Sequence, residues 1–354
     1  MSSPFPLYLT FDDVALVPRY NNINSRTEPD TSSWLTKNIK TGIPIVPANM
    51  DTVIGDDLAN VIVNQYKGIV IFHRFCSQEI QLQLVKKYAG HCFISCGLNP
   101  NMENLRELYE AGALGVCIDI AHGHSSRMIN LIRELKTLFP NKDVIAGNIC
   151  TAVGYQDLVN AGADAVKVGI GPGAACTTRV VTGFGCPQFS AIYEISKLAK
   201  ALRVPIIADG GIRNSRDMVL AIAAGASTVM IGSLFAKTIE SNAPKFTLDN
   251  TPITNQDLLN NRSICYDIKY RGQASKDFQD EYYGGMKNKT VAEGIAFTSS
   301  GTGPASNLID ELLGGYRSAL TYGGARDIKE LQRKAEFVQV THSYIGESYP
   351  RKNQ

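Results

Sequence analysis

Short apolar runs alternate with longer amphipathic stretches along this chain, starting at residue 44. The runs are rich in β-branched residues and apolar at consecutive positions, as parallel strands buried on both faces must be. Most neighbouring runs start about one strand plus one crossover helix apart. The pattern predicts eight strands, at residues 44–50, 68–73, 91–97, 114–121, 142–150, 163–170, 204–211 and 227–233.

Eight repeats of this kind favour a closed (β/α)8 TIM barrel over an open doubly wound sheet. An open sheet usually has fewer strands and a nucleotide fingerprint after the first. The 354 residues fit one elaborated barrel, so we expect residues 1–354 to form a single catalytic domain. Between His73 and His91 only 17 residues remain, enough for one helix but not for an inserted module.

Two segments are longer than a barrel needs. The loop from Gly171 to about Pro187 follows the sixth strand, and residues 241–307 follow the eighth. Loops at the carboxyl ends of barrel strands carry the chemistry in this architecture. We predict that the second segment, rich in Gly, Lys, Asp, Tyr and Asn, is a mobile flap, although a plain surface insertion could have the same composition.

Composition and charge indicate that the protein binds a small molecule rather than nucleic acid or a membrane. The 35 Lys and Arg residues against 33 Asp and Glu give a net charge of +2, too little to hold nucleic acid electrostatically. No apolar stretch is long enough to span a bilayer, and the first residues do not resemble a secretory signal. We therefore expect a cytoplasmic protein whose eight cysteines are mostly buried, reduced thiols.

The segment from residue 168 to residue 188, VGIGPGAACTTRVVTGFGCPQ, carries the strongest chemical signal. It begins as the sixth strand and then presents glycines, which let the backbone approach a ligand closely, just before Cys176. A cysteine at a barrel mouth beside Arg179 suits a thiolate nucleophile, because nearby positive charge lowers a thiol pKa. Cys117 and Cys150 lie within predicted strands, where we expect structural thiols.

Two glycine-containing turns follow the seventh and eighth strands, in ADGGI (208–212) and IGS (231–233). Many barrels bind a phosphate group here through backbone N–H groups. A single turn of this kind can serve only to reverse the chain, but two such turns favour a phosphate site. Asp209 would then be available to bind ribose hydroxyls. After the fourth strand, Asp119 is expected to face a cofactor ring, and His122 and His124 lack a third ligand for a metal site.

In their order along the chain, these motifs resemble those of the family of IMP dehydrogenases and GMP reductases. The most specific is the active-site loop GIGPGAACTTR with TGFG and PQ behind it. The resemblance extends over nearly the whole chain. Its other motifs are LTFDDVALVP (9–18), PANMDTV (47–53), IDIAHGHS (118–125), VIAGN (144–148), IIADGGIR (206–213), MIGSLFA (230–236), YRGQAS (270–275), AEG (292–294) and KAEFVQV (334–340).

Within this family, three features favour the reductases. PANMDTV with Asn49 is similar to the reductase version of that motif. Dehydrogenases usually carry a regulatory module between the second and third strands, where this chain has no room for one. Their flap also holds an Arg-Tyr pair that activates water, whereas this flap has only Tyr270-Arg271, in the reverse order.

The strongest argument for a reductase is Glu293, which matches a flap glutamate that works with the threonine two residues after the nucleophile, here Thr178. The resemblance implies attack of Cys176 on C2 of GMP, departure of ammonia, and hydride transfer from NADPH to the thioimidate to release IMP. Thr178 and Glu293 would protonate the departing amine. The implied role is interconversion and salvage of purine nucleotides.

The resemblance also implies binding residues, a monovalent cation such as K+, and a homotetramer. The residues expected at the nucleotide are Asp209, Gly210, Gly211, Gly232, Ser233, Gly272, Gln273, Ala274 and Gly294. Those expected at the cofactor are Ser25, Arg26, Arg74, Asp119, Ile120, Ala121, Ile170 and Gly171. The arginines suit a 2′-phosphate, and the carbonyls of Gly171, Gly173 and Cys176 would hold the cation.

The chain departs from the family pattern at two places. Ala174 and Ala175 stand where many relatives carry a serine near the phosphate, so backbone groups and Ser233 would have to hold it. Gln273-Ala274 replace the Met-Ser of many reductases, which favours backbone contacts to the base.

Three other functions stay open. An IMP dehydrogenase without its regulatory module would convert IMP to XMP with NAD. A catalytically silent nucleotide-binding protein would not need Cys176, Thr178 and Glu293 together. A flavin-dependent barrel oxidoreductase would leave the nucleophile loop unexplained.

Overall fold

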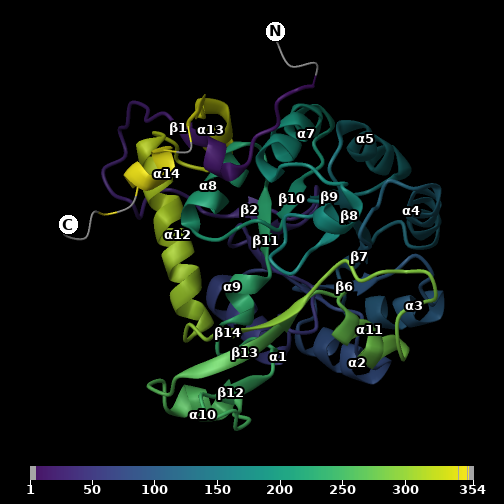
Figure 1. Cartoon of the computed structure of the whole chain (residues 1–354). Coiled ribbons are helices and arrows are strands. Elements are labelled where there is room, and N and C mark those ends of the chain that lie inside the picture. Colours follow the sequence, from purple (N-terminus) through teal and green to yellow (C-terminus); the bar gives the residue numbers. More distant parts are fainter. Residues whose placement is uncertain (1–4, 342, 349, 351–354) are drawn as a thin grey trace.

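The computed structural model describes residues 5–341, 343–348 and 350. Its largest sheet has eight parallel strands that pair in chain order, and β11 pairs with β4. Because β4 and β5, at the two ends of this order, contact each other, the sheet curls into a nearly closed barrel (Figure 1). The strands are β4 (Ile45–Pro47), β5 (Val70–Phe72), β6 (Cys92–Cys96), β7 (Gly115–Asp119), β8 (Asp143–Ile149), β9 (Ala165–Val168), β10 (Ile206–Asp209) and β11 (Thr228–Ile231). Each lies within a predicted run, which confirms the (β/α)8 barrel.

Helices on the outside of the barrel connect these strands. Many begin at a polar side chain, such as Ser77 or Asn101, that accepts a hydrogen bond from a backbone N–H of the first turn. The helices that follow β5 to β8 are α2 (Gln78–Lys87), α3 (Met102–Glu110), α4 (Ser126–Leu138) and α5 (Ala152–Ala161). Those that follow β4 and β9 to β11 are α1 (Asp56–Asn60), η2 (Val61–Gln65), α6 (Thr178–Thr182), α7 (Gln188–Leu202), α8 (Ser215–Ala223), α9 (Ser233–Ala236) and α12 (Ala305–Tyr322).

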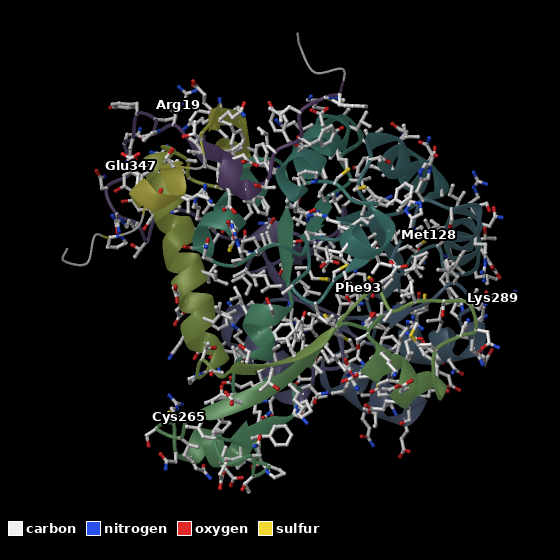
Figure 2. All side chains as sticks on the ribbon, in the orientation of Figure 1. Arg19, Phe93, Met128, Cys265, Lys289 and Glu347 are labelled. Carbon is white, nitrogen blue, oxygen red and sulfur yellow. The ribbon has the colours of Figure 1, made fainter. Side chains whose placement is uncertain are left out.

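The core fills the barrel and the layer between strands and helices. Phe93 of β6 is fully buried and lies near the middle of the barrel (Figure 2). The strand interiors are buried at consecutive positions, as their uninterrupted apolar runs require. Over the described residues, no helix combines the length and the apolar character needed to cross a membrane.

The predicted flap segment contains regular structure. Its strands β12 (Lys245–Thr247), β13 (Tyr266–Arg271) and β14 (Ala296–Ser300) form an antiparallel sheet, with α10 (Asn255–Asn260) and α11 (Lys276–Tyr283) between them. In Figure 1 this ribbon runs past the barrel strands toward α11. Phe278 of α11 packs edge-on against Phe75, which follows β5. Residues 272–295, which include α11, form the connection between β13 and β14.

The first and last described strands pair with each other outside the barrel. β1 (Val14–Leu16), which follows η1 (Phe11–Asp13), pairs antiparallel with β15 (Phe337–Gln339). The loop after β1 then contacts the end of α12, where Arg19 N–H donates to the carbonyl of Tyr322. The remaining elements are β2 (Ser33–Trp34), β3 (Lys40–Thr41), α13 (Ile328–Lys334) and α14 (Ser343–Ser348).

Candidate active site

Cys176 lies on the loop between β9 and α6, at the carboxyl end of the barrel strands. Gly171 adopts a positive φ of 82° there, in the left-handed region that glycine tolerates at no steric cost. The Cys176 N–H then donates to the carbonyl of Gly173 at 3.0 Å, which forms a tight turn. This turn leaves the Cys176 thiol partly exposed at the barrel mouth, as a nucleophile must be.

A chain of three side chains begins at this thiol. The Cys176 Sγ lies 3.3 Å from Thr178 Oγ1, and the Thr178 hydroxyl donates to Glu293 Oε2 at 2.9 Å. Glu293 is far away in the sequence, on the segment between α11 and β14. The structure thus brings together the three residues that were predicted to be catalytic.

Backbone hydrogen bonds hold the Glu293 segment against the cysteine loop. Thr177 N–H donates to the carbonyl of Glu293 at 3.0 Å, and Ile295 N–H donates to that of Ala175 at 2.9 Å. Glu293 N–H in turn donates to the carbonyl of Ala274 at 3.1 Å. Residues 293–295 therefore lie between the loop after β9 and the turn after β13, where Gly272, Ala274 and Gly294 gather.

Arg179, three residues after Cys176, binds the backbone of its own loop. Its guanidinium donates to the carbonyls of Ile170, at 3.2 Å, and Cys186. The Cys150 thiol, followed by the charge of Arg179, lowers the pKa of the Cys186 thiol, whereas the pKa of Cys150 is raised. Arg179 thus binds the backbone of the loop that carries Cys176, and its action on the nucleophile stays a prediction.

Cys150 differs from expectation. It lies one residue beyond the end of β8 and is partly exposed, not buried within the strand. The Cys186 thiol, followed by burial, raises the pKa of the Cys150 thiol. Cys117, in contrast, is fully buried within β7, as predicted.

The glycines expected at the phosphate group follow β10 and β11. Gly210 and Gly211 have positive φ angles of 88° and 82°, so a side chain at either position would strain the turn. Gly232 precedes α9, and a Cβ there would lie 2.7 Å from the hydroxyl oxygen of Tyr270. Backbone N–H groups and the Ser233 hydroxyl thus occupy one corner of the barrel mouth, with Tyr270 above it.

Lys167 is a central residue that the sequence analysis missed. Its ammonium lies 2.6 Å from Asp119 Oδ1 and 3.1 Å from Asp209 Oδ2, and its side chain is 1% exposed. Burial alone would lower the pKa of Lys167, but the two carboxylates outweigh it and raise that pKa. One cation therefore joins the carboxylate predicted at the cofactor to the one predicted at the ribose.

The sequence contains a signal for this network. Lys167 stands alone in the apolar run AVKV, and a lysine at a buried strand position needs an anionic partner. Asparagines complete the arrangement: Asn49 Nδ2 donates to Asp119 Oδ2 at 3.1 Å, and Asn148 Nδ2 donates to Asp209 Oδ2 at 2.9 Å. Each carboxylate is thus held by a cation and an amide.

Gln273 is expected at the nucleotide, but its side chain is already bound. Its Nε2 donates to the carbonyl of Asn49 at 3.0 Å. This contact leaves the backbone of residues 272–274 for a ligand, in line with the expectation that backbone groups contact the base.

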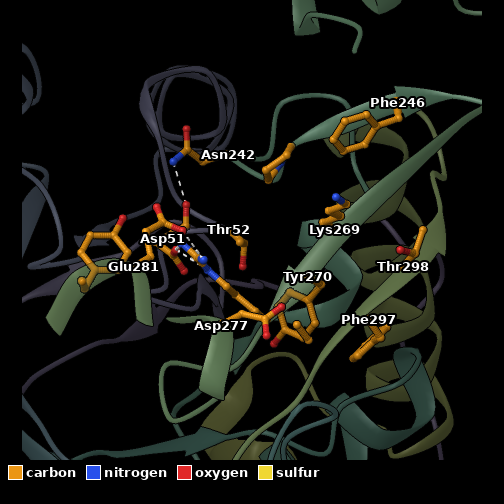
Figure 3. Close-up of a pocket in the computed structure, with 14 residues that line it drawn as sticks. Asp51, Thr52, Asn242, Phe246, Lys269, Tyr270, Asp277, Glu281, Phe297 and Thr298 are labelled. Carbon is orange, nitrogen blue, oxygen red and sulfur yellow. Dashed lines mark hydrogen bonds and ion pairs between the residues drawn. The ribbon is translucent and has the colours of Figure 1, made fainter. Parts of the chain in front are cut away.

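A cavity of about 630 Å³ lies beside this turn, between the β13 and β14 ribbon and the segment after β4 (Figure 3). On one side, Asp51 Oδ2 accepts from Arg271 Nε at 2.9 Å and from Arg271 Nη2 at 2.6 Å. Arg271 also pairs with Glu281 of α11. Arg271 is therefore held at the base of the flap by two carboxylates.

The residues expected at the cofactor fall into two groups. Arg74, Asp119, Ile120, Ala121, Ile170 and Gly171 follow strands β5, β7 and β9 at the barrel mouth. Ser25 and Arg26 lie instead on the loop after β1, and Arg26 lines a groove with Thr321 and Tyr322 at the end of α12. Figure 1 shows this loop on the α12 side of the molecule, away from β6 and β7. One chain by itself does not bring the two groups together.

The histidines after β7 have a carboxylate neighbour that the sequence did not indicate. His124 Nε2 lies 2.8 Å from Asp157 Oδ2 of α5, and the ring of His122 lies 6.5 Å from that of His124. Among the described residues, no group of three or more His, Cys, Asp and Glu side chains is placed to hold a metal ion.

Comparison with known proteins gives a consistent family match. Over residues 8–351, the chain matches the family described as "IMP dehydrogenase / GMP reductase domain". An inosine-5′-monophosphate dehydrogenase of Borreliella burgdorferi is 35% identical over 396 aligned residues, which cover 97% of this chain and 96% of that relative. Proteins of the same name from Aquifex aeolicus and Streptococcus pyogenes are each 44% identical, over 80% and 71% of this chain. The alignments span 57% and 50% of those two longer relatives.

Proposed function

The chain belongs to the IMP dehydrogenase / GMP reductase family of purine nucleotide oxidoreductases, and we propose that within this family it is a GMP reductase. The observation that carries the proposal is the hydrogen-bond chain from Cys176 through Thr178 to Glu293. Both hydrogen bonds run toward Glu293, so the chain can pass the thiol proton to that carboxylate and return it to a group that leaves from the carbon bound to the cysteine sulfur. Expulsion of ammonia needs that proton, because an amine leaves poorly unless it is protonated.

The flap supports the same assignment. The resemblance associates the dehydrogenase with a flap Arg-Tyr pair that activates water. Residues 272–293 contain no arginine, and the nearby Arg271 is bound to Asp51 and Glu281. An arginine held by two carboxylates is a poor base for activating water. The flap thus has a carboxylate that can carry the proton for ammonia but lacks the expected water activator.

In the proposed reaction, Cys176 Sγ bonds to C2 of GMP and the amine on that carbon departs as ammonia, protonated through Thr178 and Glu293. The nucleotide is then held as a thioimidate. NADPH, when bound, supplies the hydride that reduces C2, after which the C–S bond breaks and releases IMP and the Cys176 thiolate. Nucleophilic catalysis of this kind divides one difficult step into easier ones.

The nucleotide would be held by the groups around the barrel mouth. Asp209 is positioned for ribose hydroxyls by Lys167 and Asn148. The phosphate would be bound by backbone N–H groups of the turns after β10 and β11, with Ser233 and without a serine on the cysteine loop. The base would lie near the backbone of Gly272, Gln273, Ala274 and Gly294, which also supports Glu293.

The cofactor residues at the barrel mouth fit a nicotinamide ring, because Asp119 is held in place by Lys167 and Asn49 and keeps acceptor capacity. We propose that Arg74 and Arg26 contact the far end of the cofactor, where guanidinium groups suit a 2′-phosphate. Arg26 and Asp119 lie in different regions of one subunit. If both contact the same cofactor, one of them must come from a neighbouring subunit. The homotetramer that the resemblance implies would provide one.

The cysteine loop also suits a monovalent cation. The carbonyl oxygens of Gly171, Gly173 and Cys176 are hard, uncharged ligands on one tight loop, of the type that K+ prefers. Gly173 already accepts one hydrogen bond, from Cys176, and a carbonyl has a second lone pair. Bound there, the cation would stabilise the turn that presents the thiol.

A second candidate is an IMP dehydrogenase without a regulatory module. It is favoured by the names of the relatives, all three of which are called inosine-5′-monophosphate dehydrogenase. In that case Cys176 would attack IMP, NAD would accept the hydride, and water would release XMP. The same cysteine loop serves both reactions, so the flap is the part that distinguishes them.

One assay in two directions tests the proposal. The purified protein is incubated with GMP and NADPH, with ammonia and IMP as the readout, and separately with IMP and NAD, with XMP as the readout. We expect turnover with GMP and NADPH and negligible formation of XMP. Formation of XMP from IMP at a rate that exceeds ammonia release from GMP would assign the chain to the dehydrogenases.

A further inference from the structure

A pocket of about 370 Å³ lies at the amino ends of the barrel strands, on the side of the barrel that faces away from Cys176. Pro205, directly before β10, and Ser227, directly before β11, both line it. Asp209, at the carboxyl end of β10, belongs to the proposed nucleotide site. The length of the barrel therefore separates a ligand in this pocket from the residues of the proposed reaction.

Hydrogen bonds to the barrel hold the walls of this pocket. Ser33 of β2 donates its hydroxyl to the carbonyl of Ser227 at 2.5 Å, which fixes β2 beside the start of β11. Gln332 of α13 lines the pocket, and its Nε2 donates to the carbonyls of Ile222 at 3.1 Å and Ala226 at 3.0 Å. Elements from three parts of the chain thus form a cavity that exists before any ligand arrives.

The charged side chains that line the pocket are all basic. They are Lys37, Lys200, Arg203 and Lys329, and no Asp or Glu is among the lining residues. Lys37 pairs with the buried Asp164 at 2.8 Å. The side chains of the other three form no ion pair or hydrogen bond with any residue in the described part of the chain. Three cations without a counter-ion at one cavity make a strong local attraction for an anion.

The three cations come from two different helices. Lys200 lies in the last turn of α7, and Arg203 ends that helix in the left-handed conformation, with a φ of 57°, where glycine is the usual residue. Lys329 lies in the first turn of α13. Guanidinium and ammonium groups on separate helices suit an anion with several charged oxygens, such as a chain of phosphates, better than one small ion.

Trp34 of β2 adds an aromatic surface to the same pocket. It is the only tryptophan of the chain, its side chain is 36% exposed, and it lines the pocket together with the cations. An exposed indole ring is a platform on which a planar heterocycle can stack. The pocket thus combines a stacking surface with cations, the two features that recognise a base and its phosphates.

We propose that this pocket is a second nucleotide site, which binds a nucleoside triphosphate with its base against Trp34 and its phosphates against Lys200, Arg203 and Lys329. The site goes beyond the proposed function, because its residues lie at the other end of the barrel and take no part in the reaction. A nucleotide with one phosphate offers fewer charged oxygens to the three cations and should bind the pocket more weakly.

The test titrates the full chain with ATP and, separately, with inorganic triphosphate, which has the charge but no base. IMP, a ligand under both candidate functions, is kept at saturation to fill the barrel mouth. The fluorescence of Trp34 reports binding directly, and calorimetry gives the affinity independently. Lys200→Gln and Lys329→Gln each remove one cation at an exposed position, which spares the fold. Lys197→Gln is the matched control, because Lys197 lies on the same helix but pairs with Glu194.

We expect ATP to change the fluorescence of Trp34 and to bind more tightly than inorganic triphosphate. Lys200→Gln and Lys329→Gln should each weaken ATP binding by roughly tenfold, the loss of one charge-assisted contact, whereas Lys197→Gln should bind like the parent. Turnover should be the same in all three variants, so this result is independent of which reaction the barrel mouth catalyses. Unchanged fluorescence with ATP, or equal affinity in the two pocket variants and the control, would overturn the site. Equal affinity for ATP and inorganic triphosphate would overturn the stacking of a base on Trp34.

Discussion

At the scale of single residues, the chemistry depends on side chains that short backbone segments bring into contact. Cys176 and Thr178 are two residues apart, and their side chains are in contact directly after the tight turn from Gly173 to Cys176. Glu293 reaches them because its own backbone is hydrogen-bonded to Thr177 and Ala274. The carboxylate is therefore positioned by main-chain contacts that a change of its side chain would leave in place.

Replacing the nucleophile should separate binding from chemistry. We expect Cys176→Ser to abolish turnover and leave GMP binding largely intact, because a serine hydroxyl is a far weaker nucleophile at neutral pH without a dedicated base. Steady-state ammonia release and equilibrium binding of GMP measure the two effects. Cys186→Ser serves as the comparison. An equal loss of turnover in that variant would move the nucleophile to Cys186.

Replacing Glu293 should slow the release of ammonia more than the transfer of hydride. Glu293→Gln keeps the size of the side chain but cannot exchange the proton that ammonia needs, a role typically worth roughly 100- to 10,000-fold. Net reduction of GMP should slow strongly, whereas isotope exchange from labelled NADPH into IMP, which expels no amine, should slow less. Glu281→Gln, on the same flap but paired with Arg271, is the control. Release of ammonia by Glu293→Gln at the parent rate would remove the main argument for a reductase.

At the scale of elements, three strands of the barrel share one buried charge network. Asp119 ends β7, Lys167 lies within β9, and Asp209 ends β10. β9 pairs in parallel with β10, and β8 separates β9 from β7, so all three side chains reach the barrel mouth at a similar height. The three strands thus hold the two carboxylates close enough for one ammonium group to contact both.

Removal of the shared cation should destabilise the fold and give it a new pH dependence. In Lys167→Met, two carboxylates are left without their ammonium, at a cost of about 3 to 5 kcal/mol by analogy with broken buried ion pairs. Their repulsion should raise the pKa of one of them in the folded state. That state then binds more protons than the unfolded chain, so the stability of the variant falls as pH rises above about 4.

Urea unfolding measures this effect, and the deficit relative to the parent protein should be larger near pH 8 than near pH 5. Lys136→Met is the matched control, because Asp164 would still pair with Lys37 at 2.8 Å. A deficit in Lys167→Met that is independent of pH, or no larger than that in Lys136→Met, would contradict a role for Lys167 as the shared counter-ion.

At the scale of the whole molecule, the cofactor residues divide between two regions. Asp119 and Arg74 belong to the barrel mouth, whereas Ser25 and Arg26 lie on the loop packed against α12. If both regions serve one cofactor, they must come from different subunits. Under this proposal, assembly of subunits would be required for activity.

Mixed assemblies test this division. Arg26→Ala should raise the KM for the cofactor, and Cys176→Ser should be inactive by itself. In hybrids assembled from these two variants, some sites would combine an intact Cys176 of one subunit with an intact Arg26 of its neighbour. Their KM for the cofactor should therefore return toward the parent value, as measured by steady-state kinetics. Hybrids that keep only the raised KM of Arg26→Ala would mean that Arg26 acts within its own subunit or elsewhere.

The sequence by itself determined the parts of this protein that depend on local pattern. The apolar runs of eight strands, the glycine-rich approach to Cys176 and the tight turns at Gly210 and Gly211 follow from residue type and spacing along one segment. Only the tertiary structure decided which distant side chains meet. Lys167 between the carboxylates of Asp119 and Asp209, and Thr178 against Glu293, each join segments that are far apart in the sequence. Such contacts depend on how the barrel closes, because closure sets which strand ends become neighbours, and no local periodicity encodes that.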